Sequence, residues 1–166
     1  MSEPTNARSA HLADQFEAAL DEFIRLVESL DEKQWLLVGK NFPQRFNDED
    51  EGRSAGVIAH HVAINGDWIV KRLQAMLEGA PLTPVNIQTV NSEHAQKHGD
   101  VAREEVLRIL RESKPRLAAA VRAIPDDQLD MQRETPVGPM SVAQRIERVL
   151  IGHMKTHQGS IEAAIA

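Results

Sequence analysis

Apolar residues recur every three or four positions along most of this chain, the period expected of helices with one buried face. In the clearest stretch, from Thr5 to Leu30, the repeating positions are Leu12, Phe16, Ala19, Leu20, Phe23, Ile24, Val27 and Leu30. Similar stretches run from Ser54 to Glu78, from Val101 to Ala123, and from Ser141 to near the C-terminus. The pattern predicts four long helices, and no segment shows the two-residue alternation of a half-buried strand.

Capping residues indicate where two of these helices begin. Asp100 is placed to cap the third helix. Ser141, followed three residues later by Gln144, has the spacing of a capping box at the start of the fourth. Pro115 falls inside the third helix, and we expect it to kink that helix because proline cannot donate a backbone hydrogen bond.

Long connections separate the helices. Residues 31–53 carry Trp35 and the acidic run from Asp48 to Glu51, and we expect a surface loop there. Residues 79–100 are expected to be irregular except for a short polar helix near residues 92–98. Helices of about 20 to 26 residues are about 30 to 39 Å long, so four of them can align around one core. We therefore predict an all-α fold, a four-helix bundle with long crossover connections, in a single domain spanning residues 1–166.

Composition narrows the functional classes. A chain of 166 residues, 42% of them hydrophobic, suits one core rather than two. The net charge of −6, with acidic and basic side chains mixed in every segment, argues against nucleic acid or an anionic membrane as a partner. No apolar segment approaches the roughly 20 residues of a membrane span and no targeting segment is evident, so we expect a cytoplasmic protein. The absence of cysteine excludes thiolate ligands and a thiol nucleophile supplied by the chain.

Two histidines interrupt the apolar stripe of the fourth helix. His153 and His157 lie on the same side as Ile146, Leu150 and Ile161 at 100° per residue. A spacing of four residues places both imidazoles on one face, one turn apart. Two of their ring nitrogens can therefore reach one metal ion at about 2.0 to 2.1 Å.

The second helix contains two adjacent histidines, and a helical wheel separates them. His61 falls on the apolar side, with Ile58 and Val62, whereas His60 falls on the side of Asp67. Three neutral imidazoles facing one interior each need a donor and an acceptor, and an unpaired buried polar group costs about 1 to 3 kcal/mol.

A shared cation would satisfy one nitrogen on each of the three rings. We predict a metal site formed by His61, His153 and His157, with separate hydrogen bonding of each ring as the alternative. Zinc is the first choice of metal, and nickel or iron also suit nitrogen ligands. Three protein ligands leave a coordination position for water or substrate, as in catalytic sites.

Other residues have weaker claims to the site. Asn65, one turn after His61, either lines the pocket or is hydrogen-bonded at the core boundary. Trp68 is either a wall of the cavity or part of the core packing. His94 and His98 have the spacing of a ligand pair, but polar neighbours surround them, so we expect them, like His60, to be poorer candidates as ligands.

Two segments resemble the DinB-like (DinB/YfiT) superfamily, and the likeness extends over nearly the whole chain. They are the run from Ser54 to Ala63, which contains His60 and His61, and the run from His153 to Gln158. The resemblance implies a four-helix bundle in which a histidine of the second helix and a His-x-x-x-His motif of the last helix hold a divalent metal. His61 takes the first of these places. Ile64 departs from the pattern, because many members carry aspartate there.

The resemblance also implies a class of activity. Related proteins include metal-dependent transferases that use low-molecular-weight thiols such as bacillithiol or mycothiol, and related bundles include a thiol-dependent isomerase. The leading interpretation is therefore a thiol S-transferase that acts on a small-molecule substrate, with the sulfur nucleophile borrowed from a thiol cofactor. A metal-dependent hydrolase is the second interpretation. The third is a non-catalytic metal-binding stress or interaction bundle that forms a homodimer.

Overall fold

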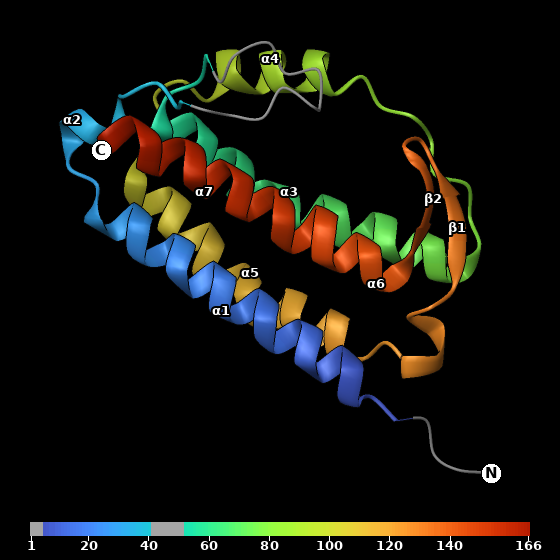
Figure 1. The fold of residues 1–166 in the computed structure, drawn as a ribbon. Helices are drawn as coiled ribbons and strands as arrows, with labels where there is room; N and C mark the ends of the chain where they lie inside the picture. The colour runs from blue at the N-terminus through green and yellow to red at the C-terminus, as the bar shows by residue number, and fades with distance from the viewer. Residues whose placement is uncertain (1–4, 41–51) are drawn as a thin grey trace.

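Four long helices form the bundle of Figure 1, a computed structural model that describes residues 5–40 and 52–166. Three of them are α1 (Ala7–Ser29), α3 (Ala55–Glu78) and α5 (Arg103–Arg122). The fourth is continuous through α6 (Val142–Arg145), the π-helical segment η3 (Ile146–Ile151) and α7 (Gly152–Ile165). The prediction of an all-α bundle is confirmed. The acidic run from Asp48 to Glu51 lies outside the described residues.

Shorter elements occupy the connections. They are α2 (Glu32–Trp35), α4 (Ile87–Lys97), the 3₁₀ helix η2 (Asp126–Gln128), and the strands β1 (Gln132–Thr135) and β2 (Gly138–Ser141). The strands form an antiparallel hairpin in which Gln132 pairs with Ser141 and Thr135 with Gly138. The sequence pattern did not indicate this hairpin, because four residues are too few to show an alternation.

Local hydrogen bonds explain where the helices begin. Ser54 caps α3, since its hydroxyl accepts a hydrogen bond from the Val57 amide, and Ser141 forms the predicted capping box with Gln144. The prediction for Asp100 is wrong: α5 begins at Arg103, and its N-cap residue makes no side-chain capping bond. The polar helix α4 is longer than predicted, because Asn86 caps it at Ile87.

One hydrophobic cluster fills the bundle. Each long helix contributes side chains to it, and those that are almost fully buried include Phe23, Ile58, Leu110 and Ile161. Burial of these apolar surfaces is the main stabilising term of such a fold. In the part of the chain that the structure describes, no helix is both long enough and apolar enough to cross a membrane.

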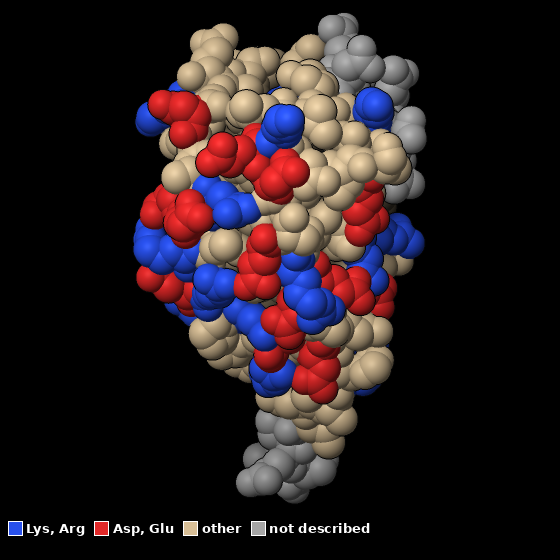
Figure 2. Space-filling view, turned by 90° about the vertical axis from the view of Figure 1, so that its left-hand side faces the viewer, with Lys and Arg blue, Asp and Glu red and all other residues tan. Residues whose placement is uncertain are grey.

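Ion pairs line the exposed seam between α1 and α5. Lys114 lies 2.5 Å from Asp21 and Arg122 lies 2.6 Å from Asp14, measured between the charged atoms. Figure 2 shows acidic and basic side chains intermingled on the face that it presents, rather than gathered into a patch of one sign. Exposed pairs of this kind each contribute about 0 to 1 kcal/mol. The apolar contacts buried between α1 and α5 therefore stabilise this pair of helices more than the ion pairs do.

A remote carboxylate caps the start of α1. Asp126, in η2, accepts hydrogen bonds from the backbone amides of Arg8 (3.1 Å) and Ser9 (3.0 Å), and from the Thr5 hydroxyl (3.2 Å). These amides belong to the first turn of α1, whose own N-cap residue makes no side-chain bond. Burial alone would raise the pKa of Asp126, but the hydrogen bonds from Arg8, Ser9 and Thr5 outweigh it and lower the pKa.

Trp35 joins three segments at the other end of the bundle. Its indole Nε1 donates a hydrogen bond to the Val101 carbonyl, 3.0 Å away, just before α5. The ring lies against Gly56 in the first turn of α3, where an added Cβ would be 2.5 Å from Nε1. Glycine is therefore needed at position 56 so that the ring can lie against the backbone of α3.

Replacing Asp126 with alanine should lower the melting temperature at pH 7 by about 2 to 4 °C, because the first turn of α1 loses its acceptor. The carboxylate has a folded-state pKa below its reference value of 3.8, so its stabilisation is complete above pH 3.8 and is lost as the pH falls through the lower folded-state pKa. Urea unfolding at several pH values should show that the gap in free energy of unfolding between wild type and variant narrows below about pH 4. Asp127→Ala, at the exposed neighbour, is the control; an equal gap at pH 7 and pH 3 would contradict the assignment.

Replacing Gly56 with alanine should destabilise the protein by about 1 to 3 kcal/mol, since the new methyl group displaces the Trp35 ring and breaks its bond to Val101. Urea denaturation followed by tryptophan fluorescence measures the loss. Gly159→Ala is a matched control in α7, because no atom lies within 4 Å of the added Cβ. It should be neutral or stabilising by up to about 1 kcal/mol. Equal effects of the two substitutions would rule out the steric explanation.

Candidate metal centre

Three of the predicted site residues meet between α3 and α7. His61 comes from α3, and His153 and His157 come from successive turns of α7. The Nε2 atom of His153 lies 3.3 Å from Nε2 of His61 and 3.0 Å from Nε2 of His157. His61 is 7% exposed, His157 is 1% exposed, and His153 is partly buried. The structure therefore brings these three nitrogens to one point in a largely dry environment.

The spacing of the three nitrogens suits a bound cation. Two nitrogens bound to one ion at about 2.0 to 2.1 Å, with an angle of about 90 to 109° at the ion, lie about 2.8 to 3.4 Å apart. The two separations of 3.0 and 3.3 Å fall in this range. His61, His153 and His157 are also one of the groups whose ligand atoms all lie close enough together to hold an ion.

Hydrogen bonds alone satisfy this arrangement poorly. Nε2 of His61 also lies 3.3 Å from the amide nitrogen of Asn65, which can only donate. If Nε2 of His153 accepts from both other rings, His61 carries a proton there and cannot accept from Asn65. If Nε2 of His153 is protonated instead, its single proton must be shared between the other two rings, which weakens each bond. A cation that receives all three lone pairs removes this conflict, so the residues fit a metal.

A π-helical segment sets the position of His153. The segment η3 ends at Ile151, two residues before His153. Because a π turn contains more residues than an α turn, it shifts the inward face of the following helix, and Ile151 and Met154 are buried while His153 lies at the edge. A uniform helical wheel cannot show this shift. Of the three predicted ligands, His153 is consequently the one that is not fully buried.

Burial favours the neutral form of two rings of the site, His61 and His153. Desolvation lowers the pKa of His61 and of His153 well below the ordinary value, and the neighbouring His157 and the positive charge of Arg53 lower both further. Neutral imidazole is the form that binds a metal. Arg53 was not among the residues predicted for the site. Its only signal is its place immediately before the cap of α3, two turns ahead of the histidines.

A small cavity lies beneath the site. Its volume is about 20 Å³, and Asn65 and His153 line it together with apolar residues such as Val62 and Met154. This is room for about one water molecule and not for an organic substrate. Trp68 does not line this cavity: its side chain is 39% exposed and packs against the Arg72 guanidinium, whose carbon is 4.8 Å from the ring centroid. The expectation that Trp68 faces inward is wrong.

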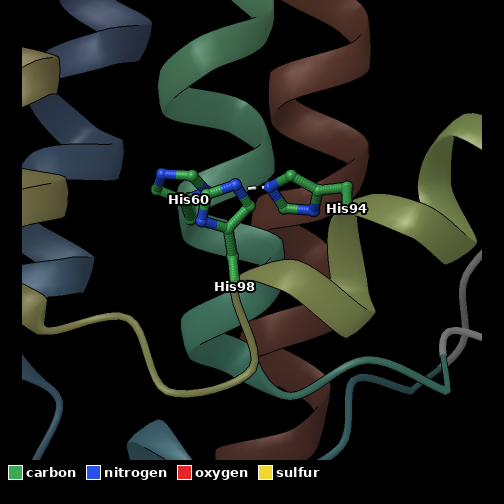
Figure 3. A group of neighbouring side chains, drawn as sticks. All are labelled: His60, His94 and His98. Carbon is green, nitrogen blue, oxygen red and sulfur yellow. Dashed lines mark hydrogen bonds between the residues drawn. The ribbon is translucent and has the colours of Figure 1, made fainter.

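The remaining histidines also differ from expectation. His60 and His94, expected on polar and solvated sides of their helices, are buried, with exposures of 6% and 9%. The reason is that their rings stack on each other between α3 and α4, with centroids 5.0 Å apart, and His98 joins them (Figure 3). Burial first, then the neighbouring His60, His98 and Arg53, lowers the pKa of His94 to about 4.

A known protein family matches most of this chain. The profile of the DinB superfamily matches residues 15–161, which include both α3 and the His153–His157 pair. Neither the curated proteins nor the solved structures that were searched gave a match. Because the profile covers nearly the whole chain, including all or most of every long helix, this protein belongs to the DinB superfamily.

Proposed function

We propose that this protein is a metal-dependent enzyme whose ion is held by His61, His153 and His157. The observation that carries the proposal is the convergence of three Nε2 atoms, with separations of 3.0 and 3.3 Å, in contacts that hydrogen bonds satisfy poorly. A divalent ion bound there would supply a Lewis acid with an open coordination position, at which a thiol or a water loses its proton more readily.

The residues around the ligands have separable roles in this proposal. Asn65 contacts His61 and orients its ring, as outer partners of metal-bound histidines commonly do. Arg53 is close enough to lower the pKa of both His61 and His153, and a positive charge at that distance favours an anionic ligand or substrate group. The partial exposure of His153 provides the approach for a small molecule.

A thiol S-transferase is the reaction that we favour. The chain has no cysteine, so a sulfur nucleophile must come from a small thiol. In the reaction, the thiol loses its proton, its sulfur forms a bond to an electrophilic carbon of the substrate, and the leaving group departs with the bonding electrons. The family resemblance supports this class, and the nitrogen ligands suit zinc first, with nickel or iron as substitutes.

Hydrolysis is the second candidate, and one feature favours it. The cavity of about 20 Å³ beside His153 and Asn65 has room for about one water molecule, next to the proposed ligands. Among residues 5–40 and 52–166 no general base is evident beside it, because Asp67 pairs with Arg116 on the surface and Glu162 contacts Gln158. In either reaction, the ligands and the approach to the site are what the chain itself contributes.

Replacing His153 with alanine should remove one equivalent of bound zinc and weaken that site by more than about 100-fold, because two ligands cannot replace three. The measurement is zinc content by mass spectrometry after metal stripping, reconstitution and dialysis, with affinity from calorimetry. His11→Ala is the control, since His11 is an exposed histidine on α1. Equal zinc content in wild type and His153→Ala would refute the site.

Metal-reconstituted protein should consume a small thiol and an electrophile together, and chelation or His153→Ala should reduce the rate by at least about 100-fold. Bacillithiol, mycothiol and glutathione are assayed with a chromogenic alkylating substrate, and product is identified by mass. Metal-dependent ester or amide cleavage without thiol consumption would favour hydrolysis instead. If the metal binds but neither reaction occurs, the protein is a non-catalytic metal-binding bundle.

A further inference from the structure

A second group of three histidines lies where α4 contacts α3. His60 comes from α3, His94 from α4, and His98 from the C-cap of α4 (Figure 3). Nδ1 of His60 is 2.8 Å from Nε2 of His94, and one ring nitrogen of each residue lies within 4.8 Å of the other two. The ring centroid of His98 is 4.3 Å from that of His60 and 5.0 Å from that of His94. Three rings from two elements are thus gathered around one point.

The burial pattern of α4 is the reverse of what the hydrophobic effect would produce. Among the eleven residues of this helix, His94 is the one that is buried, while Ile87 and Val90 are each about half exposed. An amphipathic helix packed by apolar contacts would bury the isoleucine and valine and leave the histidine in water. Apolar packing therefore does not explain why α4 lies where it does, and the histidines are its attachment to α3.

Hydrogen bonding leaves this attachment incomplete. In the short contact between His60 and His94, one ring nitrogen donates its proton to the other. Nδ1 of His94 is buried and has no hydrogen-bond partner among the residues that the structure describes. Buried polar atoms of this kind are rare in folded proteins, and each needs a physical reason. Binding of Nε2 to an ion shared with His60 and His98 would leave Nδ1 unpaired, but the binding free energy would offset the cost of burying it.

We propose that His60, His94 and His98 bind a second divalent transition-metal ion, separate from the ion on His61, His153 and His157, and that this ion fastens α4 to α3. The separation of 2.8 Å between His60 and His94 lies at the lower end of the range for two nitrogens on one ion. The ring nitrogen of His98 lies within 4.8 Å of those of His60 and His94. Because His98 is partly exposed, rotation of its side chain would bring that nitrogen within bonding distance of the same ion. A site of imidazoles without carboxylates takes zinc, cobalt, nickel or copper rather than magnesium or calcium.

The two sites are neighbours that share no ligand. His60 and His61 are consecutive residues, so their side chains leave α3 about 100° apart and reach different partners. The ring centroids of His61 and His94 are 5.7 Å apart, which places α4 beside the first site. An ion in the second site would therefore hold α4 next to the entrance of the first.

Metal titration of the full chain tests the proposal. Metal-stripped wild type, His98→Ala, His153→Ala, the double variant and the surface control His11→Ala are titrated with Zn²⁺ by calorimetry and with Co²⁺ by visible absorption. We expect two ions for wild type and for His11→Ala, one ion for each single variant, and none for the double variant. Hydrogen exchange of residues 87–98 should slow at least tenfold on zinc addition in wild type and His153→Ala but not in His98→Ala.

The outcomes separate the two proposals. One ion in wild type and in His98→Ala, with none in His153→Ala, would overturn the second site and leave the first intact. Loss of an ion in His98→Ala but not in His153→Ala would support the second site and overturn the proposed function. If His98→Ala does not fold by circular dichroism, the wild type decides: exchange of residues 87–98 that is unchanged up to two equivalents of zinc would overturn the second site.

Discussion

The structure depends on one constraint: imidazole rings that are taken out of water must find partners for their nitrogens. Helix α3 carries two such rings in succession, and each contacts a histidine of a different element. His61 contacts His153 of α7, and His60 contacts His94 of α4. The position of α3 is in turn set by its start, where Ser54 caps the first turn and Trp35 lies against Gly56. The packing at the start of α3 therefore positions the histidines of both groups.

Periodicity alone was enough to locate the four long helices, because a buried face of three- and four-residue steps has few alternatives over twenty residues. The same pattern pointed to His61, His153 and His157, which the structure brings together. It failed for His60 and His94, since a helical wheel describes one helix at a time and treats any polar side as solvated. Burial of those two rings arises only when α3 and α4 cover each other, a tertiary contact that neither segment encodes separately.

Other errors have equally local causes. The hairpin of β1 and β2 is too short for an alternation to be visible, and Asp100 resembles a cap but stands too far before α5. Trp68 was placed inside from its apolar character, whereas stacking with Arg72 lets it remain at the surface. Arg53, whose positive charge lowers the pKa of histidines in both groups, belongs to no sequence motif. Only the structure shows that it lies near them.

The π-helical segment before His153 has an evolutionary consequence. A π turn differs from an α turn by one residue, so a single-codon insertion in an ordinary helix can create it. In a chain without that extra residue, the helix that follows would be rotated by about 100°, and His153 and His157 would both turn away from His61. The grouping of the three rings and its loss are thus separated by one residue in sequence space, so the length of this helix is as much a part of the site as its histidines.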